Sequence, residues 1–217
     1  MKTKLTLFVT VLAAALFGVG CASVVKNDSS KFPAADSESG DKRLESIITK
    51  RGNWIVQGDV IHQTQTDIDG RYSDLMAIVE EKLQGDFQLE VEIEITADGG
   101  LSNYCSGIIV GAKDFENFYY FYFGQSGEVA FARYSSGRWA NMKSKRIERE
   151  YVEDPLPIGK KIIVGITRKQ NVLTVFVDRH KKYSVDLQSV NFSGNYYGFT
   201  TGWGAAAKFR ILAAKSK

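Results

Sequence analysis

The sequence predicts an all-β fold, a two-sheet antiparallel β-sandwich of the jelly-roll type. Three observations predict it. From about residue 47 onward, apolar residues recur with a period of two rather than 3.6. Turn residues interrupt this alternation roughly every ten positions, which is typical of short antiparallel strands. The chain has 217 residues, of which 44% are hydrophobic, so it can bury one core. About a dozen strands in about 165 residues of the folded part favour a sandwich.

The clearest strand covers residues 87–95. Its apolar residues all fall on one side of the pleat, while Glu90, Glu92 and Glu94 fall on the other. We interpret the three glutamates as a solvated sheet face, with a role in sugar binding or hydrolysis as the alternative.

The most unusual strand covers residues 117–123, because residues 118–123 are all aromatic. Alternation must point aromatic rings to both faces of this strand. We assign the odd-numbered rings to the core and the even-numbered ones, which include Tyr120 and Tyr122, to the opposite face.

One segment is ambiguous, since residues 73–85 have helical spacing between a Ser and a Gly that suit helix ends. We interpret it as a strand because its neighbours are all β. Turns are expected at 113–114, 124–127, 169–171 and 178–182. The other expected strands cover residues 60–63, 106–110, 128–134, 162–166, 173–177, 183–187, 197–203 and 207–213.

The N-terminus predicts export. Lys2 and Lys4 precede an apolar run that ends in small residues before Cys21, as in a signal peptide over residues 1–20. The end of this run resembles a bacterial lipobox, which implies lipidation of Cys21 and a bacterial cell envelope location, with the outer membrane favoured by Ala22 and Ser23. Cleavage after Ala22, giving a periplasmic or secreted protein, is the alternative.

Residues 21–46 are polar and poor in large apolar residues, which predicts a flexible tether. Residues 47–217 are then the β-sandwich domain. Without Lys2 and Lys4, the 28 basic residues become 26 against 25 acidic ones, a net charge of +1. This balance favours neither nucleic acid nor an anionic membrane surface as a partner. We therefore expect no nucleic acid partner, and contact with the membrane through the lipid anchor.

Apolar and turn residues follow one another in a characteristic order along the domain. They are Trp54, 60–62, 85–92, 106–108, 117–121, 173–178, 198–199 and 208–209. This order resembles the concanavalin A-like lectin/glucanase jelly roll, with the laminin G-like and 3-keto-disaccharide hydrolase-like branches most similar. The resemblance covers residues 50–214 and departs from the pattern at 178–181, where the Asp-Gly turn common in these folds is absent.

This resemblance implies that sugars lie on the concave sheet face. Tyrosines there stack on a pyranose ring while their hydroxyl groups bind its polar edge. We therefore predict a glycan-binding module with Tyr120, Tyr122, Arg133, Trp139 and His62 as ligand-binding residues. The alternative is that a loop over residues 135–145 covers this face and the tyrosines only pack.

Other functions stay open. A glycoside hydrolase or lyase would use the same face, but the Glu-x-Asp-x-x-Glu pattern of such hydrolases is absent here, so the sequence favours a binding module over an enzyme. A protein-interaction or adhesion scaffold is the third option. No cofactor is expected; calcium is implied by family analogy only, because Asp98, Asp114 and Asp178 form no ligand series.

Overall fold

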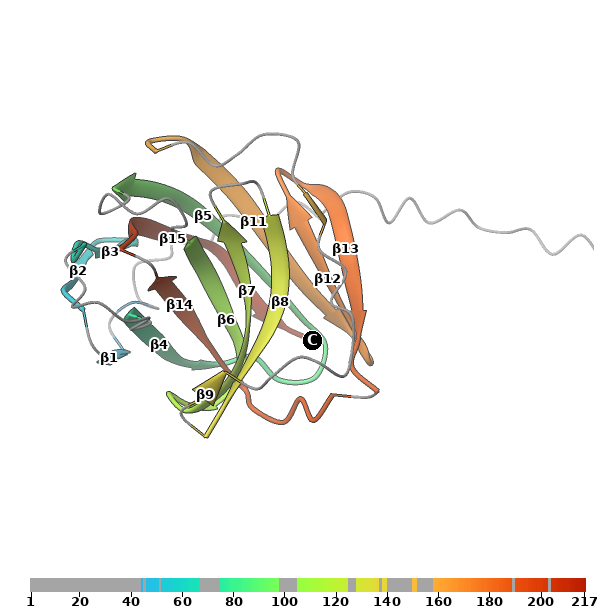
Figure 1. The fold of residues 1–217 in the computed structure, drawn as a ribbon. Helices are drawn as coiled ribbons and strands as arrows, with labels where there is room; N and C mark the ends of the chain where they lie inside the picture. Colours follow the sequence, from blue (N-terminus) through green and yellow to red (C-terminus); the bar gives the residue numbers. More distant parts are fainter. Residues whose placement is uncertain are drawn as a thin grey trace, which may run out of the picture.

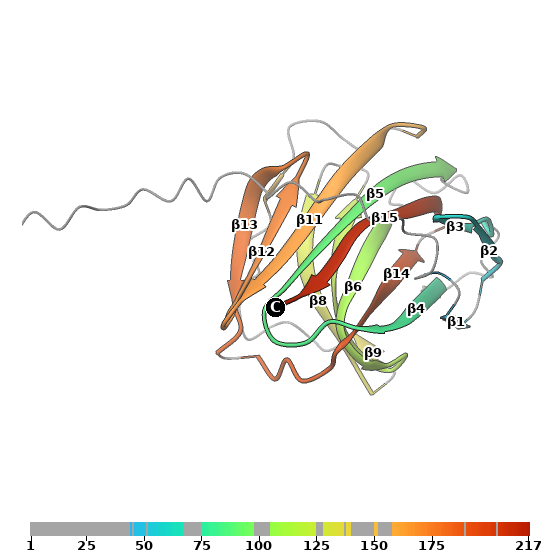
Figure 2. The same ribbon diagram turned by 180° about the vertical axis from the view of Figure 1, so that it is seen from behind.

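The computed structural model describes residues 44, 46–50, 52–66, 75–97, 105–124, 128–136, 138–139, 150–151, 158–188, 190–202 and 204–217. These residues form two antiparallel sheets stacked face to face, as the sequence predicts. In Figure 1, β7 and β8 of one sheet lie in front of β5 and β15 of the other, and Figure 2 shows the reverse. No helix in the described part of the chain is long and apolar enough to cross a membrane. The expected signal peptide and most of the tether lie outside the described residues.

The eight-stranded sheet has the order β1-β4-β14-β6-β7-β8-β10, with β9 paired to β8. The three consecutive strands β6, β7 and β8 form a meander at its centre. Its strands are β1 (Ile47–Lys50), β4 (Leu75–Lys82), β6 (Cys105–Asp114), β7 (Asn117–Gly124), β8 (Glu128–Ser135), β9 (Arg138–Trp139), β10 (Glu150–Tyr151) and β14 (Tyr196–Gly202).

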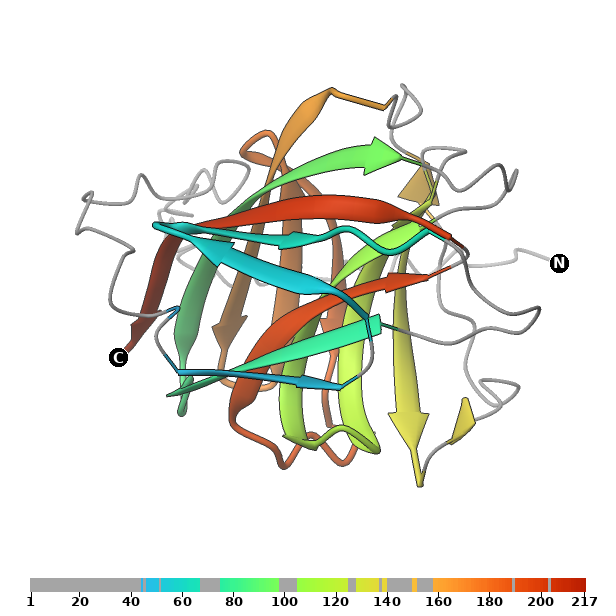
Figure 3. The ribbon, with the colours of Figure 1, turned by 90° about the vertical axis from the view of Figure 1, so that its left-hand side faces the viewer.

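The seven-stranded sheet has the order β13-β12-β11-β5-β15-β3-β2. The edge strands β1 and β2, one from each sheet, lie on the same side of the sandwich (Figure 3). The strands are β2 (Trp54–Gln57), β3 (Val60–Gln63), β5 (Phe87–Ala97), β11 (Lys161–Lys169), β12 (Val172–Val177), β13 (His180–Asp186) and β15 (Ala206–Ser216).

The main core lies between the two sheets and contains the apolar side of each strand. Phe121 of β7 and Phe209 of β15, from opposite sheets, are both fully buried in it. Leu44, which the sequence analysis places in the tether, is also in this core and only 3% exposed. The folded part therefore extends slightly before residue 47.

The ambiguous segment is a strand. β4 pairs with β1 and with β14, so its backbone hydrogen bonds are made in the sheet rather than in a helix. Gly198 of β14 allows close approach to β4, because a Cβ there would lie 2.0 Å from the carbonyl oxygen of Ala77. Sheet pairing thus outweighs the helical spacing of this segment.

The expectation of a solvated three-glutamate face is wrong for Glu90, whose side chain is 1% exposed. The turn between β12 and β13 explains its burial in part. Asp178 and Arg179 both have positive φ, 49° and 66°, and the Arg179 Nε lies 3.4 Å from Glu90 Oε1. The turn that departs from the usual Asp-Gly pattern therefore places a guanidinium group against this carboxylate.

Candidate functional site

The outer face of the eight-stranded sheet has an apolar cluster of its own, separate from the main core. Its residues alternate along the strands with those that point between the sheets. We call it the aromatic face. Its buried members are Met76, Ile78, Ile109, Ala112, Phe118, Tyr120 and Ala132, and Phe115, Tyr122, Tyr134 and Tyr196 are partly buried against them.

The predicted division of the aromatic strand is confirmed, since odd-numbered rings of β7 lie in the core and even-numbered ones on the aromatic face. However, Tyr120 is only 3% exposed. Its ring centroid lies 5.8 Å from those of Phe118 and Tyr122. The expectation that this whole side is open is thus wrong for Tyr120, which supports its neighbours by packing.

Tyr122 is the more accessible of the two tyrosines, because it is only partly buried. Its register partners are Gly107 on β6 and Ala130 on β8. A Cβ on Gly107 would lie 2.8 Å from the carbonyl oxygen of Phe121, so no side chain fits there without a shift of the backbone. Small residues on both adjacent strands therefore flank the Tyr122 ring.

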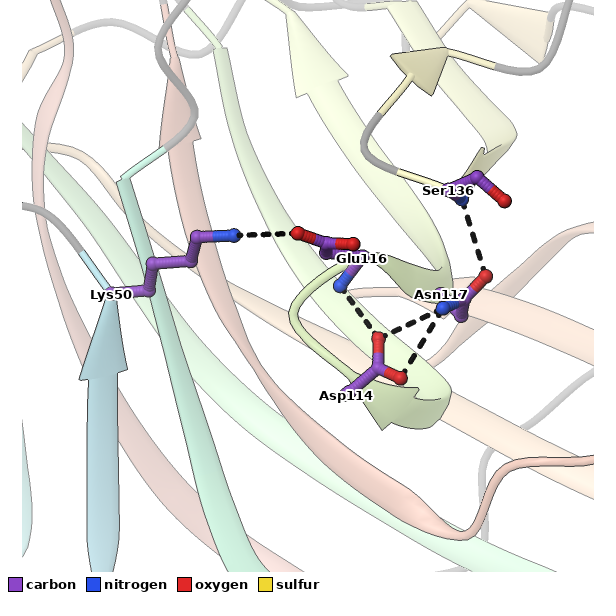
Figure 4. A network of polar contacts seen from close by, with 5 residues as sticks. All are labelled: Lys50, Asp114, Glu116, Asn117 and Ser136. Atoms are coloured by element: carbon purple, nitrogen blue, oxygen red, sulfur yellow. Dashed lines mark hydrogen bonds and ion pairs between the residues drawn. The ribbon is translucent and has the colours of Figure 1, made fainter.

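Charged groups border the aromatic face. Lys50 Nζ of β1 lies 3.8 Å from Glu116 Oε1 in the β6–β7 turn and 6.0 Å from the centroid of the Phe115 ring. Lys82 Nζ lies 5.4 Å from the centroid of Tyr196. The Lys50–Glu116 contact joins the edge strand to a turn between the third and fourth strands inward from it (Figure 4).

The β6–β7 turn is held by side-chain hydrogen bonds (Figure 4). The Asp114 carboxylate accepts from the Glu116 backbone N–H at 2.7 Å and from Asn117 Nδ2 at 3.0 and 3.2 Å. Asn117 Oδ1 in turn accepts from the Ser136 backbone N–H at 3.2 Å. The network links this turn to the one after β8.

Arg133 does not share the aromatic face. It is the register partner of Tyr119, whose ring points into the core, and its guanidinium carbon lies 5.9 Å from that ring's centroid. The Tyr119 hydroxyl donates to the Asn191 carbonyl at 3.0 Å. Burial raises the pKa of Tyr119, and Arg133 partly opposes this shift.

His62 belongs to β3 of the other sheet, so the expectation that it shares a face with Tyr122 is wrong. Its Nε2 lies 3.3 Å from the Thr96 hydroxyl oxygen. Burial lowers the pKa of His62, Lys208 lowers it further, and Glu94 opposes both. Trp139 lies opposite Tyr134 in the backbone register of β9 and β8. Whether Tyr120, Tyr122, Arg133, Trp139 or His62 contacts a ligand stays a prediction.

The outer face of the seven-stranded sheet is a ladder of ion pairs. It carries the three glutamates of β5, which therefore lie on the sheet opposite the aromatic face. Glu92 and Glu94 are partly exposed, as expected of a solvated face. The pairs are Lys161–Glu92 at 2.9 Å, Arg179–Glu90 at 3.4 Å, Lys208–Glu94 at 3.9 Å and Arg210–Asp59 at 3.0 Å.

The described residues hold no group of three or more metal-ligating side chains. Asp114 is engaged in the β6–β7 turn, and Asp178 Oδ1 accepts from the Ile163 backbone N–H at 2.9 Å. Asp98 lies outside the described part of the chain.

Sequence reasoning missed Lys50, Phe115, Glu116, Tyr134 and Tyr196 as members or neighbours of the aromatic face. Alternation alone indicates Tyr134, because it is two residues from Ala132 on the same strand. The others depend on the sheet order β1-β4-β14-β6-β7, and no local signal in the sequence gives that order.

No protein-family model and no curated protein sequence matches this chain. Solved structures do. The carbohydrate-binding module CBM66 from Bacillus subtilis is 17% identical, with a TM-score of 0.62 over 79% of this chain and 96% of that one. The carbohydrate recognition domain of Emp46p is 10% identical, with a TM-score of 0.55 over 87% and 96%. A legume lectin-like domain from Entamoeba histolytica is 10% identical, with a TM-score of 0.53 over 86% and 100%.

These similarities establish the class of fold. The chain has the concanavalin A-like jelly roll of lectin domains, the fold expected from its sequence. At this level of identity the similarity concerns architecture, and function has to be argued from the faces of the sandwich.

Proposed function

We propose that this domain binds a glycan through the aromatic face. The observation that supports the proposal most is Tyr122, a partly buried ring flanked by Gly107 and Ala130 on a surface that carries five other aromatic rings. A tyrosine in such a setting offers an apolar ring to a sugar face and a hydroxyl group to its polar edge. The carbohydrate-binding proteins that share the fold add support by analogy.

The other sheet lends little support to recognition of a sugar ring. Its outer face consists of ion pairs in which acidic and basic side chains already contact each other. The hydrolase alternative also loses support from the glutamates of β5, since they lie on that sheet and not on the aromatic face.

A glycan array tests this proposal. The wild-type protein should bind at least one class of oligosaccharide, and Tyr122→Ala should lower the affinity by about fivefold or more, corresponding to about 1 kcal/mol or more for a stacked aromatic ring. Tyr122→Phe should lose less, because it keeps the ring. The matched control is Val172→Ala, an exposed apolar residue of β12 in the other sheet. Equal binding by Tyr122→Ala and the wild type would refute the proposed face.

We also propose that the domain is held at the bacterial envelope by a lipid on Cys21. The support is the apolar run before Cys21 and the polar segment after it. In a bacterial host, a fatty-acid analogue should label the wild-type protein, and Cys21→Ser should move the protein to a soluble fraction. Cys105→Ser is the matched control and should keep the label. An unlabelled wild-type protein would overturn the lipid anchor without affecting the glycan proposal.

A further inference from the structure

The rim of the aromatic face brings an aromatic ring, an ammonium group and a carboxylate together at one corner. Phe115 is partly buried, and Lys50 Nζ lies 6.0 Å from the centroid of its ring and 3.8 Å from Glu116 Oε1. We infer that this Lys50–Glu116 corner forms a polar subsite that selects neutral saccharides over acidic ones. The inference rests on the proposed glycan binding and specifies its class of ligand.

The corner is built in advance of any ligand. Glu116 sits in a turn whose backbone is held by the Asp114 carboxylate, and Asn117 links that turn to Ser136. None of these bonds uses the Glu116 side chain. Because the backbone of the turn is fixed by other groups, a ligand that binds the Glu116 side chain does not have to order the turn as well, which lowers the entropy cost of binding.

The Lys50–Glu116 pair is open to solvent, with side chains 36% and 60% exposed. Exposed pairs of this kind contribute little to stability. Their hydrogen-bonding capacity is also mostly unused, since an ammonium group has three donors and a carboxylate about four acceptor sites. Both groups are therefore available to a ligand, and changing them should leave the fold intact.

The charges of the corner determine the type of ligand. A neutral sugar can donate a hydroxyl hydrogen to Glu116 while a neighbouring hydroxyl oxygen accepts from Lys50. A uronic acid would place a third negative charge close to those of Glu116 and of Asp114, whose oxygens are already engaged in the turn. With Lys82 at Tyr196, the groups named here supply two ammonium groups, those of Lys50 and Lys82, and two carboxylates, those of Asp114 and Glu116. Such a balanced rim offers no net attraction to an acidic glycan.

The experiment compares matched oligosaccharides on the full protein. Titrations use oligomers of glucose, galactose and mannose and the corresponding uronic-acid oligomers, at constant low salt. The wild type should bind the best neutral oligomer at least tenfold more tightly than its acidic counterpart. Glu116→Gln should weaken neutral binding severalfold and reduce the preference to less than threefold. Asp59→Asn, which removes an ion-paired carboxylate from the other sheet, is the matched control and should behave as the wild type.

Two results would overturn the inference. Acidic oligomers that bind the wild type as tightly as neutral ones exclude the selectivity. If Glu116→Gln and Asp59→Asn changed the preference for neutral oligomers equally, the total charge of the protein and not this corner would determine that preference. Thermal melts of both variants show whether either change has disturbed the fold, and Glu116→Ala provides a second variant of the same site. Binding of no oligomer by the wild type or by any variant would instead contradict the proposed glycan binding itself.

Discussion

Arg179→Gly should destabilise this protein, although glycine is the residue that its backbone conformation favours. The φ of Arg179 is 66°, and this left-handed conformation costs a residue with a side chain about 1–2 kcal/mol. Glycine removes that cost. The substitution also removes the guanidinium group that lies 3.4 Å from Glu90, a carboxylate with a 1% exposed side chain.

The second effect is the larger one. Removing one partner of a buried ion pair costs about 3–5 kcal/mol, because the other charge is left buried and unpaired. Arg179 itself is 52% exposed, so the lower end of that range applies. Subtracting the relieved backbone strain leaves a loss of about 2 kcal/mol, which lowers the melting temperature by about 4–8 °C for a domain of this size.

A double-mutant cycle with Glu90→Gln separates the two effects. In the Glu90→Gln background no buried charge depends on Arg179, so Arg179→Gly should stabilise the protein by about 1 kcal/mol. The two effects of the same substitution then differ by about 3 kcal/mol, which is the coupling between the residues. Urea unfolding of the four proteins measures it. If Arg179→Gly raised stability equally in both backgrounds, Glu90 would not depend on Arg179 and our explanation of the turn would be wrong.

Three further predictions concern packing and charge. Phe121→Ala and Tyr120→Ala should each lower the free energy of unfolding by about 3–5 kcal/mol in thermal melts, because both side chains are buried. Tyr122→Ala should lower it clearly less. Equal losses of stability for all three variants would show that Tyr122 is buried too. Gly198→Ala should prevent folding, as measured by circular dichroism, since its Cβ would lie 2.0 Å from a carbonyl oxygen of β4. A normal melting curve would contradict the register between β14 and β4. Burial lowers the pKa of His62, so the unfolded chain takes up the proton at a higher pH than the folded one. Stability should therefore fall as the pH decreases below about 6.5, and His62→Gln should weaken that fall. The same pH dependence of stability in His62→Gln and the wild type would contradict this role of His62.

The alternation of apolar residues predicts much of this fold. It gives most strands of both sheets, without the short strands β1, β2, β9 and β10, and the division of the aromatic strand between core and outer face. The strand at β4 follows from its β neighbours in spite of its helical spacing. These features depend on local patterns, because each strand must place its apolar side toward the core.

The candidate site is predicted less completely, because it depends on which strands become neighbours. The sequence indicates that Tyr122 and His62 lie on strands but not that those strands belong to different sheets. In the same way, alternation marks Glu90 as facing outward, while its burial involves an arginine from a distant hairpin. Lys50 meets Glu116 only through the order β1-β4-β14-β6.

The central claim, that the aromatic face binds the glycan, is tested most directly by mapping the bound saccharide on the folded protein. Backbone and side-chain NMR shifts recorded during titration with the best oligosaccharide of the array locate the contact surface. We predict the largest changes at Tyr122 and Phe115 and in the β6–β7 turn, with none on the outer face of β5 and β15. Changes confined to β5, β15 and the β12–β13 turn would contradict the claim, because that surface belongs to the opposite sheet.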